Sequence, residues 1–450
     1  MSISLEWPGS PVVRDNAFAF LFPPHPMNPM STQPSEVEEF REQARRWLAE
    51  NLPERDPSTP AVRPRGTDHK TIEGIASQRG VQRKLYDAGY AGISWPAEYG
   101  GQGLTPAHER AFYQVAQGYA LPDFGVAGGT TFGVCAQTML AHASSRFLRY
   151  HIPRILAGEE LWAQFFSEPG AGSDLAGVRT SATRDGDRWI LNGSKVWSSG
   201  AYYSDYGMCL ARTNWEVPKH RGLTWFAVRT DATGVTIQPI REINGDAEFC
   251  EEFFDDVELS DDDIIGEVNH GWAVAQTMLV YERGSGNTRT GPGGTRQLAP
   301  DLVALARRFG REKDPSVRQL IARAHINDYA YTQLLDRLAG IMRNSGGIDP
   351  GVAAYGKLAM GTFTPIRARI GMEVGRGAAL LWERDDFDGM VTSINYLNAR
   401  VMSIAGGTNE MQRNGIGERV LGLPREPSFD TDKPFNQVIR DAEHWTGKVR

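Results

Sequence analysis

The spacing of hydrophobic and polar positions divides the chain into three parts. Over residues 35–158, apolar residues recur at the three- and four-residue intervals of amphipathic helices. Over residues 161–266, short runs rich in β-branched and aromatic residues are separated by Gly, Asn and Asp turns. Helical spacing returns from residue 271 onward. Helices, then strands, then helices again predict an α+β fold, because a parallel sheet would alternate strands with helices.

Five segments follow from this pattern. We expect, in chain order, an N-terminal arm (1–30), a helical domain (31–160), a β domain (161–270), a helical bundle (271–427) and a C-terminal tail (428–450). The first 29 residues lack the basic start and continuous apolar core of a signal peptide. They form either a disordered or extended arm, or a segment that does not belong to the native protein because translation starts at Met30.

Three local signals predict individual elements. Ser35 followed by Glu38 indicates a capping box at the start of the first helix. Asn192-Gly193, between two apolar runs, predicts the turn of a hairpin. Asp314 before Pro315 indicates an N-cap and a favoured first-turn proline, followed by a helix that stops near Gly346.

Composition and charge exclude several classes of protein. With 48 basic against 55 acidic residues the net charge is −7, which argues against a basic nucleic-acid-binding domain. The longest near-apolar run, 272–281, is about half of a membrane span. The three cysteines form no CxxC pair and the nine histidines no HExxH, which argues against a metal site. Few thiols suggest a reducing, cytoplasmic setting.

A cluster of glycines marks the candidate site. No GxGxxG follows a strand, so a dinucleotide would have to bind without that fingerprint. Residues 166–177 instead read FSEPGAGSDLAG, and three further motifs occur at 92–103, 192–197 and 405–414. Together, and in this order, the four motifs closely resemble those of the acyl-CoA dehydrogenase family. The resemblance extends over about residues 36–427.

That resemblance implies a fold and a reaction. It implies a helical domain, a central β-barrel or β-sandwich domain and a C-terminal four-helix bundle, with FAD between them and an acyl-CoA thioester against the flavin. A carboxylate removes the α-proton while the β-hydrogen leaves as hydride to flavin N5, giving a trans-2-enoyl-CoA. Electrons then pass to electron-transfer flavoprotein or a similar acceptor, in lipid, fatty acid or steroid catabolism.

The family motifs also imply site residues. Glycines 170 and 172 suit a backbone that must approach a phosphate closely. The implied FAD contacts are Gln164, Phe166, Ser167, Gly172, Ser173, Trp197 (stacked on the isoalloxazine), Ser199, Thr408 and Glu410. The implied substrate contacts are Ser173, Tyr281, Arg283 and Gly407. Taken singly, each has an ordinary explanation as a surface turn or a core aromatic residue.

The catalytic base requires a separate argument. Many family members carry the catalytic glutamate where this chain has Gly406, which keeps only its N–H for the thioester carbonyl. A minority branch takes its base from a Glu-Arg pair on an earlier helix, matched here by Glu282-Arg283. On a helix over 272–283, Glu282 ends an apolar stripe, so partial burial would make it a stronger base. A solvated ion pair is the alternative reading.

Two departures from the family bear on oligomerisation. Where the family often carries an arginine that reaches the FAD of the neighbouring subunit, this chain has Ala306, followed by Arg307 and Arg308. The family's Gln-x-x-Gly-Gly stretch is replaced over Gly371–Gly375. Such sites resemble heteromeric acyl-CoA dehydrogenases, in which two related subunits share FAD. A heterotetramer and a homo-oligomer therefore both stay open.

The activity has alternatives as well. Five glycines and a proline between residues 284 and 294 would end the helix early and either widen the acyl pocket for a bulky group or form a surface loop. The loss of the usual base at Gly406 also allows a non-catalytic or FAD-sharing subunit. An acyl-CoA oxidase or flavin monooxygenase on the same fold, with O2 as acceptor, is the third possibility.

Overall fold

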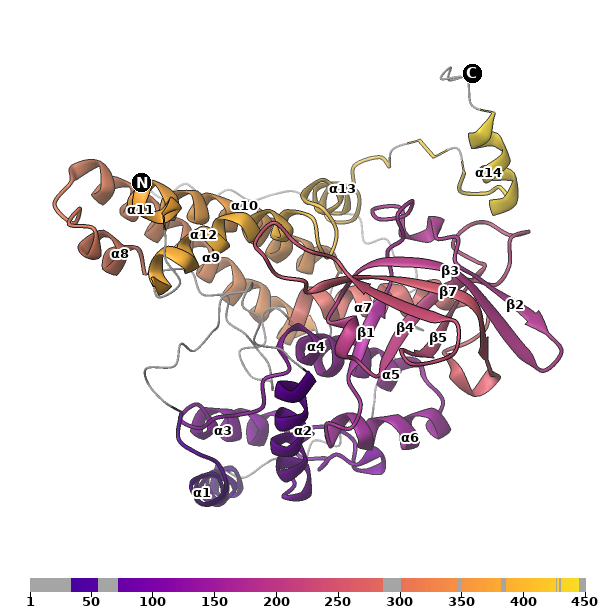
Figure 1. Cartoon of the computed structure of the whole chain (residues 1–450), viewed down its shortest axis with the longest axis horizontal. Helices are drawn as coiled ribbons and strands as arrows, with labels where there is room; N and C mark the ends of the chain where they lie inside the picture. The colour runs from indigo at the N-terminus through magenta and orange to yellow at the C-terminus, as the bar shows by residue number, and fades with distance from the viewer. Residues whose placement is uncertain are drawn as a thin grey trace, which may run out of the picture.

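Helices occupy both ends of the chain and a single sheet occupies the middle (Figure 1). This computed structural model describes residues 34–55, 72–285, 301–345, 350–381, 386–425, 427–428 and 430–444. The predicted α+β class is confirmed, and every strand among these described residues lies within 162–265. The expected N-terminal arm over 1–30 lies outside the described residues.

The N-terminal helices lie below the sheet in the view of Figure 1. They are α1 (Pro34–Asn51), α2 (Ile72–Asp87), α3 (Pro106–Ala116), α4 (Gly125–Thr130), a π-helical turn (Thr131–Cys135), α5 (Ala136–His142) and α6 (Ser145–Leu156). The first helix exists as predicted, but it begins at Pro34, so Ser35 is its second residue and not its N-cap. Proline is well tolerated in the first turn of a helix, because the N–H that it lacks would have no acceptor within the helix at this position.

The sheet has eight strands of mixed direction. They are β1 (Trp162–Phe165), β2 (Ser181–Asp185), β3 (Arg188–Ser199), β4 (Tyr206–Arg212), β5 (Leu223–Arg229), β6 (Val235–Pro239), β7 (Phe249–Leu259) and β8 (Ile264–Ile265). Their order is β6-β7-β3-β2-β4-β5-β8, with β1 parallel to β4. One face packs on the N-terminal helices and on α7 (Gly271–Ser285) through Trp162, Met208 and Trp225. The other face encloses a core that includes Phe165 and Phe226.

The predicted Asn192-Gly193 hairpin is wrong. β3 runs without interruption through both residues, and the chain reverses earlier, at Gly186 (φ +64°), between β2 and β3. The Asn192 side chain, instead of closing a turn, bonds to Asp256 on β7, where the register shifts. Gly193 is required for another reason, since a Cβ there would lie 2.7 Å from the Thr180 Cα.

Apart from the first of them, which lies near the centre beside the strands, the C-terminal helices form the left and upper part of Figure 1. They are α7 (Gly271–Ser285), α8 (Leu302–Arg308), α9 (Pro315–Ser345), α10 (Pro350–Gly375), α11 (Gly377–Leu380), α12 (Phe387–Asn398), α13 (Asn409–Arg419) and α14 (Phe435–Glu443). As predicted, α9 begins at Pro315, and Asp314 accepts a hydrogen bond from the Ser316 amide at 2.9 Å. None of the helices in the described part of the chain is long and apolar enough to cross a bilayer.

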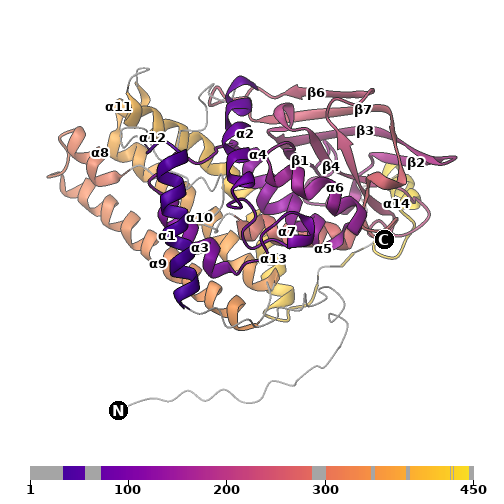
Figure 2. The same ribbon diagram turned by 90° about the horizontal axis from the view of Figure 1, so that it is seen from below.

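The last helix, α14, lies against the sheet region and apart from the other C-terminal helices (Figure 2). The Phe435 ring stacks on Trp215 at 5.8 Å and lies under the Arg212 guanidinium. Lys219, on the same loop of the sheet region, donates to Asp174 and to Asp430. The C-terminal segment is therefore anchored beside the glycine-rich loop.

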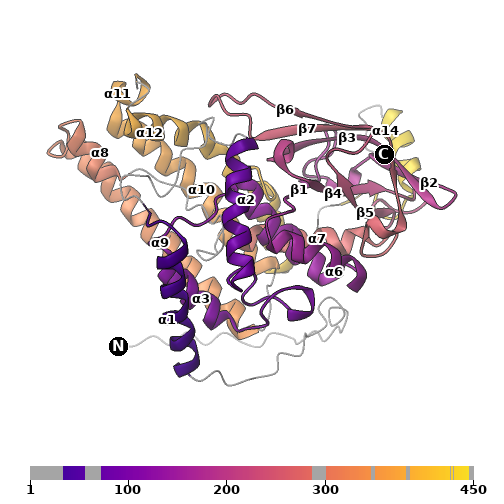
Figure 3. The same cartoon turned by 60° about the horizontal axis from the view of Figure 1, so that its bottom comes forward.

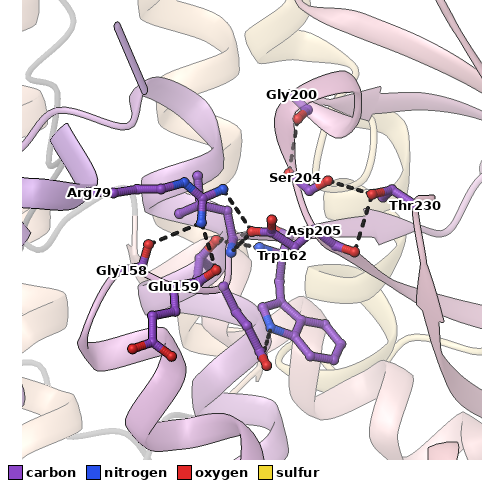
Figure 4. Close-up of polar contacts among 11 residues, drawn as sticks. Arg79, Gly158, Glu159, Trp162, Gly200, Ser204, Asp205 and Thr230 are labelled. Carbon is purple, nitrogen blue, oxygen red and sulfur yellow. Dashed lines mark hydrogen bonds and ion pairs between the residues drawn. The ribbon is translucent and has the colours of Figure 1, made fainter. Parts of the chain in front are cut away.

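A polar cluster joins the N-terminal helices to the sheet. Arg79 on α2 donates to the carbonyls of Gly158 and Glu159, and at 2.8 Å to the carboxylate of Asp205 (Figure 4). α2 lies close to the strand region in the views of Figures 1 and 3. This half-buried arginine satisfies carbonyls at the end of α6 and fixes the loop before β4 at the same time.

The other side of this cluster holds the loop after β3. The Thr230 hydroxyl donates to the carbonyls of Ser204 and Asp205. The Ser204 hydroxyl donates in turn to the Gly200 carbonyl at 2.9 Å (Figure 4). Because Gly200 directly follows β3, these bonds fix the end of the strand that carries Trp197.

Candidate active site

Trp197 has an unusual backbone conformation. Val196 pairs with Glu251 and Ser198 with Cys250, so Trp197 is the extra residue of a β-bulge between β3 and β7. Its φ is +69°, in the left-handed region that a bulky residue rarely adopts. The indole is 58% exposed and meets Phe249 edge to face. A strained residue that presents a large apolar ring to solvent indicates a binding function.

The segment before Trp197 is fixed to the glycine-rich loop. Lys195 is fully buried, and its ammonium donates to the Phe166 carbonyl at 3.0 Å and to the Glu168 carboxylate at 2.9 Å. The Val196 amide donates to the Ser167 carbonyl at 2.9 Å. These bonds align residues 166–168 alongside β3.

Glu168 itself is buried and charged. Its carboxylate accepts the backbone amides of Arg179 and Thr180 at 2.6 and 2.9 Å. Burial acts to raise the pKa of Glu168, but the Lys195 charge and these hydrogen bonds hold it below its ordinary value. The Lys195–Glu168 pair is rigid, because breaking any of these hydrogen bonds would leave a buried polar group unpaired, which is costly.

The turn after Glu168 has room for a ligand. The stretch Gly170–Ser173 contains exposed Gly172 and Ser173. A Cβ built on Gly170 or Gly172 would meet nothing within 4 Å. Backbone amides and a hydroxyl beside open space suit a phosphate group.

The second half of the site lies where α7 approaches the loop before α13. A Cβ built on Gly406 would lie 3.3 Å from Glu282 Oε1. Glu282 is half-buried on α7, on the same stripe as the buried Ala275 and the partly buried Leu279. The Glu282 charge also contributes, after burial, to raising the pKa of the Cys135 thiol on the π-helical turn. The structure thus places a carboxylate directly beside Gly406, and Glu282 lies at the end of the apolar stripe that the helical register predicts.

Two residues that the sequence analysis missed shape this loop. Lys357 on α10 is 7% exposed, its Cε is 3.2 Å from the same built Cβ, and its ammonium donates to the Met402 carbonyl. Gln412 on α13 is buried and donates to the carbonyls of Gly406 and Gly407, each at 3.1 Å. Only the isolated lysine within the apolar stretch 351–361 could have signalled the first of these contacts.

Comparison with known sequences identifies the family. Profiles of the acyl-CoA dehydrogenase N-terminal, middle and C-terminal domains match residues 34–159, 163–257 and 269–421. The chain belongs to the acyl-CoA dehydrogenase family. It is 38% identical over 393 residues to the acyl-CoA dehydrogenase IpdE1 of Mycobacterium tuberculosis, covering 87% of this chain and 99% of that protein.

Solved structures of acyl-CoA dehydrogenases share the fold. The Tcur3481-Tcur3483 steroid ACAD aligns with a TM-score of 0.69 at 27% identity, covering 88% of this chain and 99% of the other. The ChsE4-ChsE5 complex from Mycobacterium tuberculosis aligns with a TM-score of 0.62 at 27% identity, over 87% and 98% of the two chains. This chain is accordingly an acyl-CoA dehydrogenase, a flavoprotein of an oligomeric family whose cofactor is FAD.

The dehydrogenase has groups that fit FAD. The buried Gln164 Nε2 on β1 has no hydrogen-bond partner among the described residues, so it is a donor that an acceptor on the flavin would satisfy. The Trp197 indole offers a flat face for an aromatic ring, and the half-buried Ser199 follows on the same strand. The open turn at Gly172 and Ser173 completes a surface from ring to phosphate.

The remaining predicted contacts lie at the start of α13 and near the end of α7. Thr408 caps α13 by accepting the Met411 amide at 3.2 Å, and Glu410 is exposed in the first turn of that helix. Tyr281 is half-buried on α7, and burial raises the pKa of its phenol. The side chain of Arg283 lies outside the described part of the structure, so its predicted role stays a prediction.

The positions that depart from the family lie on α8 and α10. Ala306 is fully buried in the core between α8, α9 and α10. Arg308 pairs with Asp386 at 2.5 Å, whereas Arg307 is exposed. The Gly371–Gly375 stretch ends α10, where Arg311 donates to two of its carbonyls.

Proposed function

We propose that this acyl-CoA dehydrogenase removes the α-proton of an acyl-CoA thioester with Glu282 and forms a trans-2-enoyl-CoA. The contact between Glu282 Oε1 and the position of a Gly406 side chain carries the proposal. A glutamate at position 406 and one at position 282 would therefore reach the same small region of the site. Glycine at 406 leaves this region to the carboxylate of α7.

Bound FAD supplies the acceptor for the β-hydride. The chain's own residues orient the reaction around it. The Gly406 amide has no hydrogen-bond partner among the described residues, so it is available to the thioester carbonyl as charge develops there. Gln412 fixes the carbonyls of Gly406 and Gly407, and thereby the two peptide groups that directly follow the Gly406 amide.

For the acyl group we propose a bulky, ring-containing substrate. One similar solved structure is a steroid ACAD, and the match covers nearly its whole length at 27% identity. The composition of residues 284–294 supports the same assignment, because five glycines and a proline disfavour a long continuation of α7 along the acyl pocket; residues 286–300 lie outside the described part of the structure. Electron-transfer flavoprotein or a similar protein would accept the electrons.

A second proposal concerns assembly with a related, non-identical subunit. Ala306 has no side chain that could reach a neighbouring FAD, and Gly371–Gly375 lacks the family's glutamine. Two similar structures carry paired names, and one is described as a complex. The chain purified alone should be folded but deficient in FAD, and adding the partner should restore the yellow colour. A yellow homo-oligomer with one FAD per chain would reject this assembly.

The Glu282→Gln variant tests the base. In the FAD-containing assembly, the visible spectrum of the variant should keep its bound flavin, and acyl-CoA should still bind, because the side chain keeps its size. The rate of anaerobic flavin bleaching by acyl-CoA should fall by at least ~100-fold. Glu267→Gln, at an exposed position just before α7, is the matched control and should bleach at the wild-type rate. Unchanged bleaching in Glu282→Gln would remove Glu282 from the mechanism.

A further inference from the structure

The conformation of Trp197 needs to be held by its neighbours. A non-glycine residue at φ +69° is strained by about 1–2 kcal/mol and relaxes unless the surroundings prevent it. Before the bulge, Lys195 and Val196 are bound to the 166–168 segment. After the bulge, the side chain that bonds into the interior of the sheet region is Ser198.

Ser198 makes one interior bond. Its hydroxyl donates at 2.9 Å to Oε2 of Glu252, a residue of β7 that is fully buried. Lys195 and Ser198 both face this interior although they are three residues apart, an interval that would place them on opposite faces of a regular strand. The extra residue, Trp197, accounts for the change of face. The Ser198–Glu252 bond therefore exists only if the bulge exists.

Glu252 is not among the catalytic, FAD-binding or substrate-binding residues described above. It stands in the inward row of β7 between Cys250 and Phe254, and its second oxygen has no partner among the described residues. Burial raises the pKa of Glu252 to about 8. Burying a carboxyl group in an apolar row is costly. Two groups of β3 act on it: Ser198 donates a hydrogen bond to it, and the Lys195 charge counteracts the rise of its pKa.

We infer that Glu252 is a positioning residue that, through Ser198, holds the β3 bulge and presents the Trp197 indole to the flavin. The inference rests on the proposed contact between Trp197 and FAD. Without the acceptor, Ser198 would no longer be drawn inward. The bulge could then shift along β3 and turn the indole away from the cofactor surface.

The test compares FAD affinity among variants of the full chain, assembled with its partner subunit if one copurifies. The readout is the dissociation constant for FAD, measured by flavin fluorescence on apoprotein. Ser198→Ala and Glu252→Leu should each weaken binding by ~10-fold. Glu252→Gln keeps an acceptor and should bind as the wild type does. Glu251→Gln, the neighbouring residue on β7, is the control and should also be unchanged.

A double-mutant cycle separates positioning from a general loss of stability. In a Trp197→Ala background, Ser198→Ala should cause no further loss of FAD affinity, because the contact that it positions is already gone. Additive losses, or wild-type binding by Ser198→Ala and Glu252→Leu, would overturn the inference while leaving the proposed function intact. Wild-type FAD affinity in Trp197→Ala alone would overturn the proposed flavin contact and this inference together.

Discussion

The sheet region around Trp197 and the C-terminal helices around Gly406 are built differently. In the sheet region the charged groups beside the site are buried and paired, as in Lys195–Glu168, and the apolar residues are mostly enclosed. The C-terminal helices leave many large apolar side chains in solvent. Those more than 60% exposed are Ile326, Tyr329, Leu380, Leu381, Ile404 and Leu421.

This difference distinguishes the part of the flavin site that one chain forms by itself from the part that we expect a second subunit to complete. Where buried charged groups are paired within the chain, as Lys195 and Glu168 are, the local structure holds its shape without outside contacts. Apolar side chains at such exposure are characteristic of surfaces that another subunit covers. Two other helices of the same region, α8 and α10, carry the departures at Ala306 and Gly371–Gly375. We therefore expect the sheet half of the flavin site to form within one chain and the helical half to depend on the proposed assembly.

The largest expected effect concerns the interior of the sheet region. Glu252 has a pKa of about 8 in the folded protein against an ordinary 4.5. Between these pH values the folded state holds the extra proton, so the free energy of unfolding should fall as pH rises, with the full penalty above pH 8. Glu252→Gln removes this penalty. It should match wild type at pH 5 and be more stable at pH 8.5 by on the order of 2–4 kcal/mol.

Urea unfolding at both pH values measures this effect. The charged and titratable groups near Glu252 are Lys195, Glu251, Cys209 and Cys250. Burial raises the pKa of both thiols to about 12, so they stay neutral throughout this range. Glu251→Gln should keep the wild-type pH dependence. If Glu252→Gln keeps it too, the carboxyl group is not buried as a neutral acid.

The sequence predicted the succession of elements better than their turns. The helix–sheet–helix order depends on hydrophobic spacing over long stretches, and it is confirmed. The Asn192-Gly193 turn failed because a two-residue signal cannot tell a hairpin from a strand whose partner bulges. Only the contacts of Asn192 with Asp256 and of Gly193 with Thr180 decide between these, and both partners are distant in sequence.

The site was predictable to a similar extent. The place of Glu282 on an apolar stripe follows from helical register, and the structure puts it beside Gly406. The contributions of Lys357 and Gln412 were not accessible, because they depend on how α10 and α13 pack against the Gly406 loop. The bulge at Trp197 could not be predicted either, because it depends on how β3 pairs with β7.

The close contact at Gly406 should have a catalytic consequence. Its φ is +65°, and an alanine there would press its methyl group against Glu282 and Lys357. Gly422 is the matched control, because its φ is +66° and nothing lies within 4 Å of a built Cβ. Both alanine variants should lose about 1 kcal/mol of stability from backbone strain.

Only Gly406→Ala should slow flavin reduction by acyl-CoA, by ~10-fold, because its methyl displaces the carboxylate from its working position. Stopped-flow absorbance of the flavin measures the rate for both variants. Equal rates in Gly406→Ala, Gly422→Ala and the wild type would show that the contact between Glu282 and position 406 has no catalytic consequence.

The smallest expected effect concerns the exposed surface of the C-terminal helices. Ile326 and Tyr329 lie one turn apart on α9 and are 66% and 63% exposed. Replacing both with serine should weaken subunit association by ~10-fold without unfolding the chain, since neither belongs to the core. Phe253→Ser, at a 38% exposed position on β7, is the control from the sheet region. Light scattering across a dilution series should show dissociation of the α9 variant at concentrations where wild type and Phe253→Ser remain assembled. If the α9 variant keeps the wild-type mass throughout, this face of α9 is not the surface through which the helical half of the site is completed.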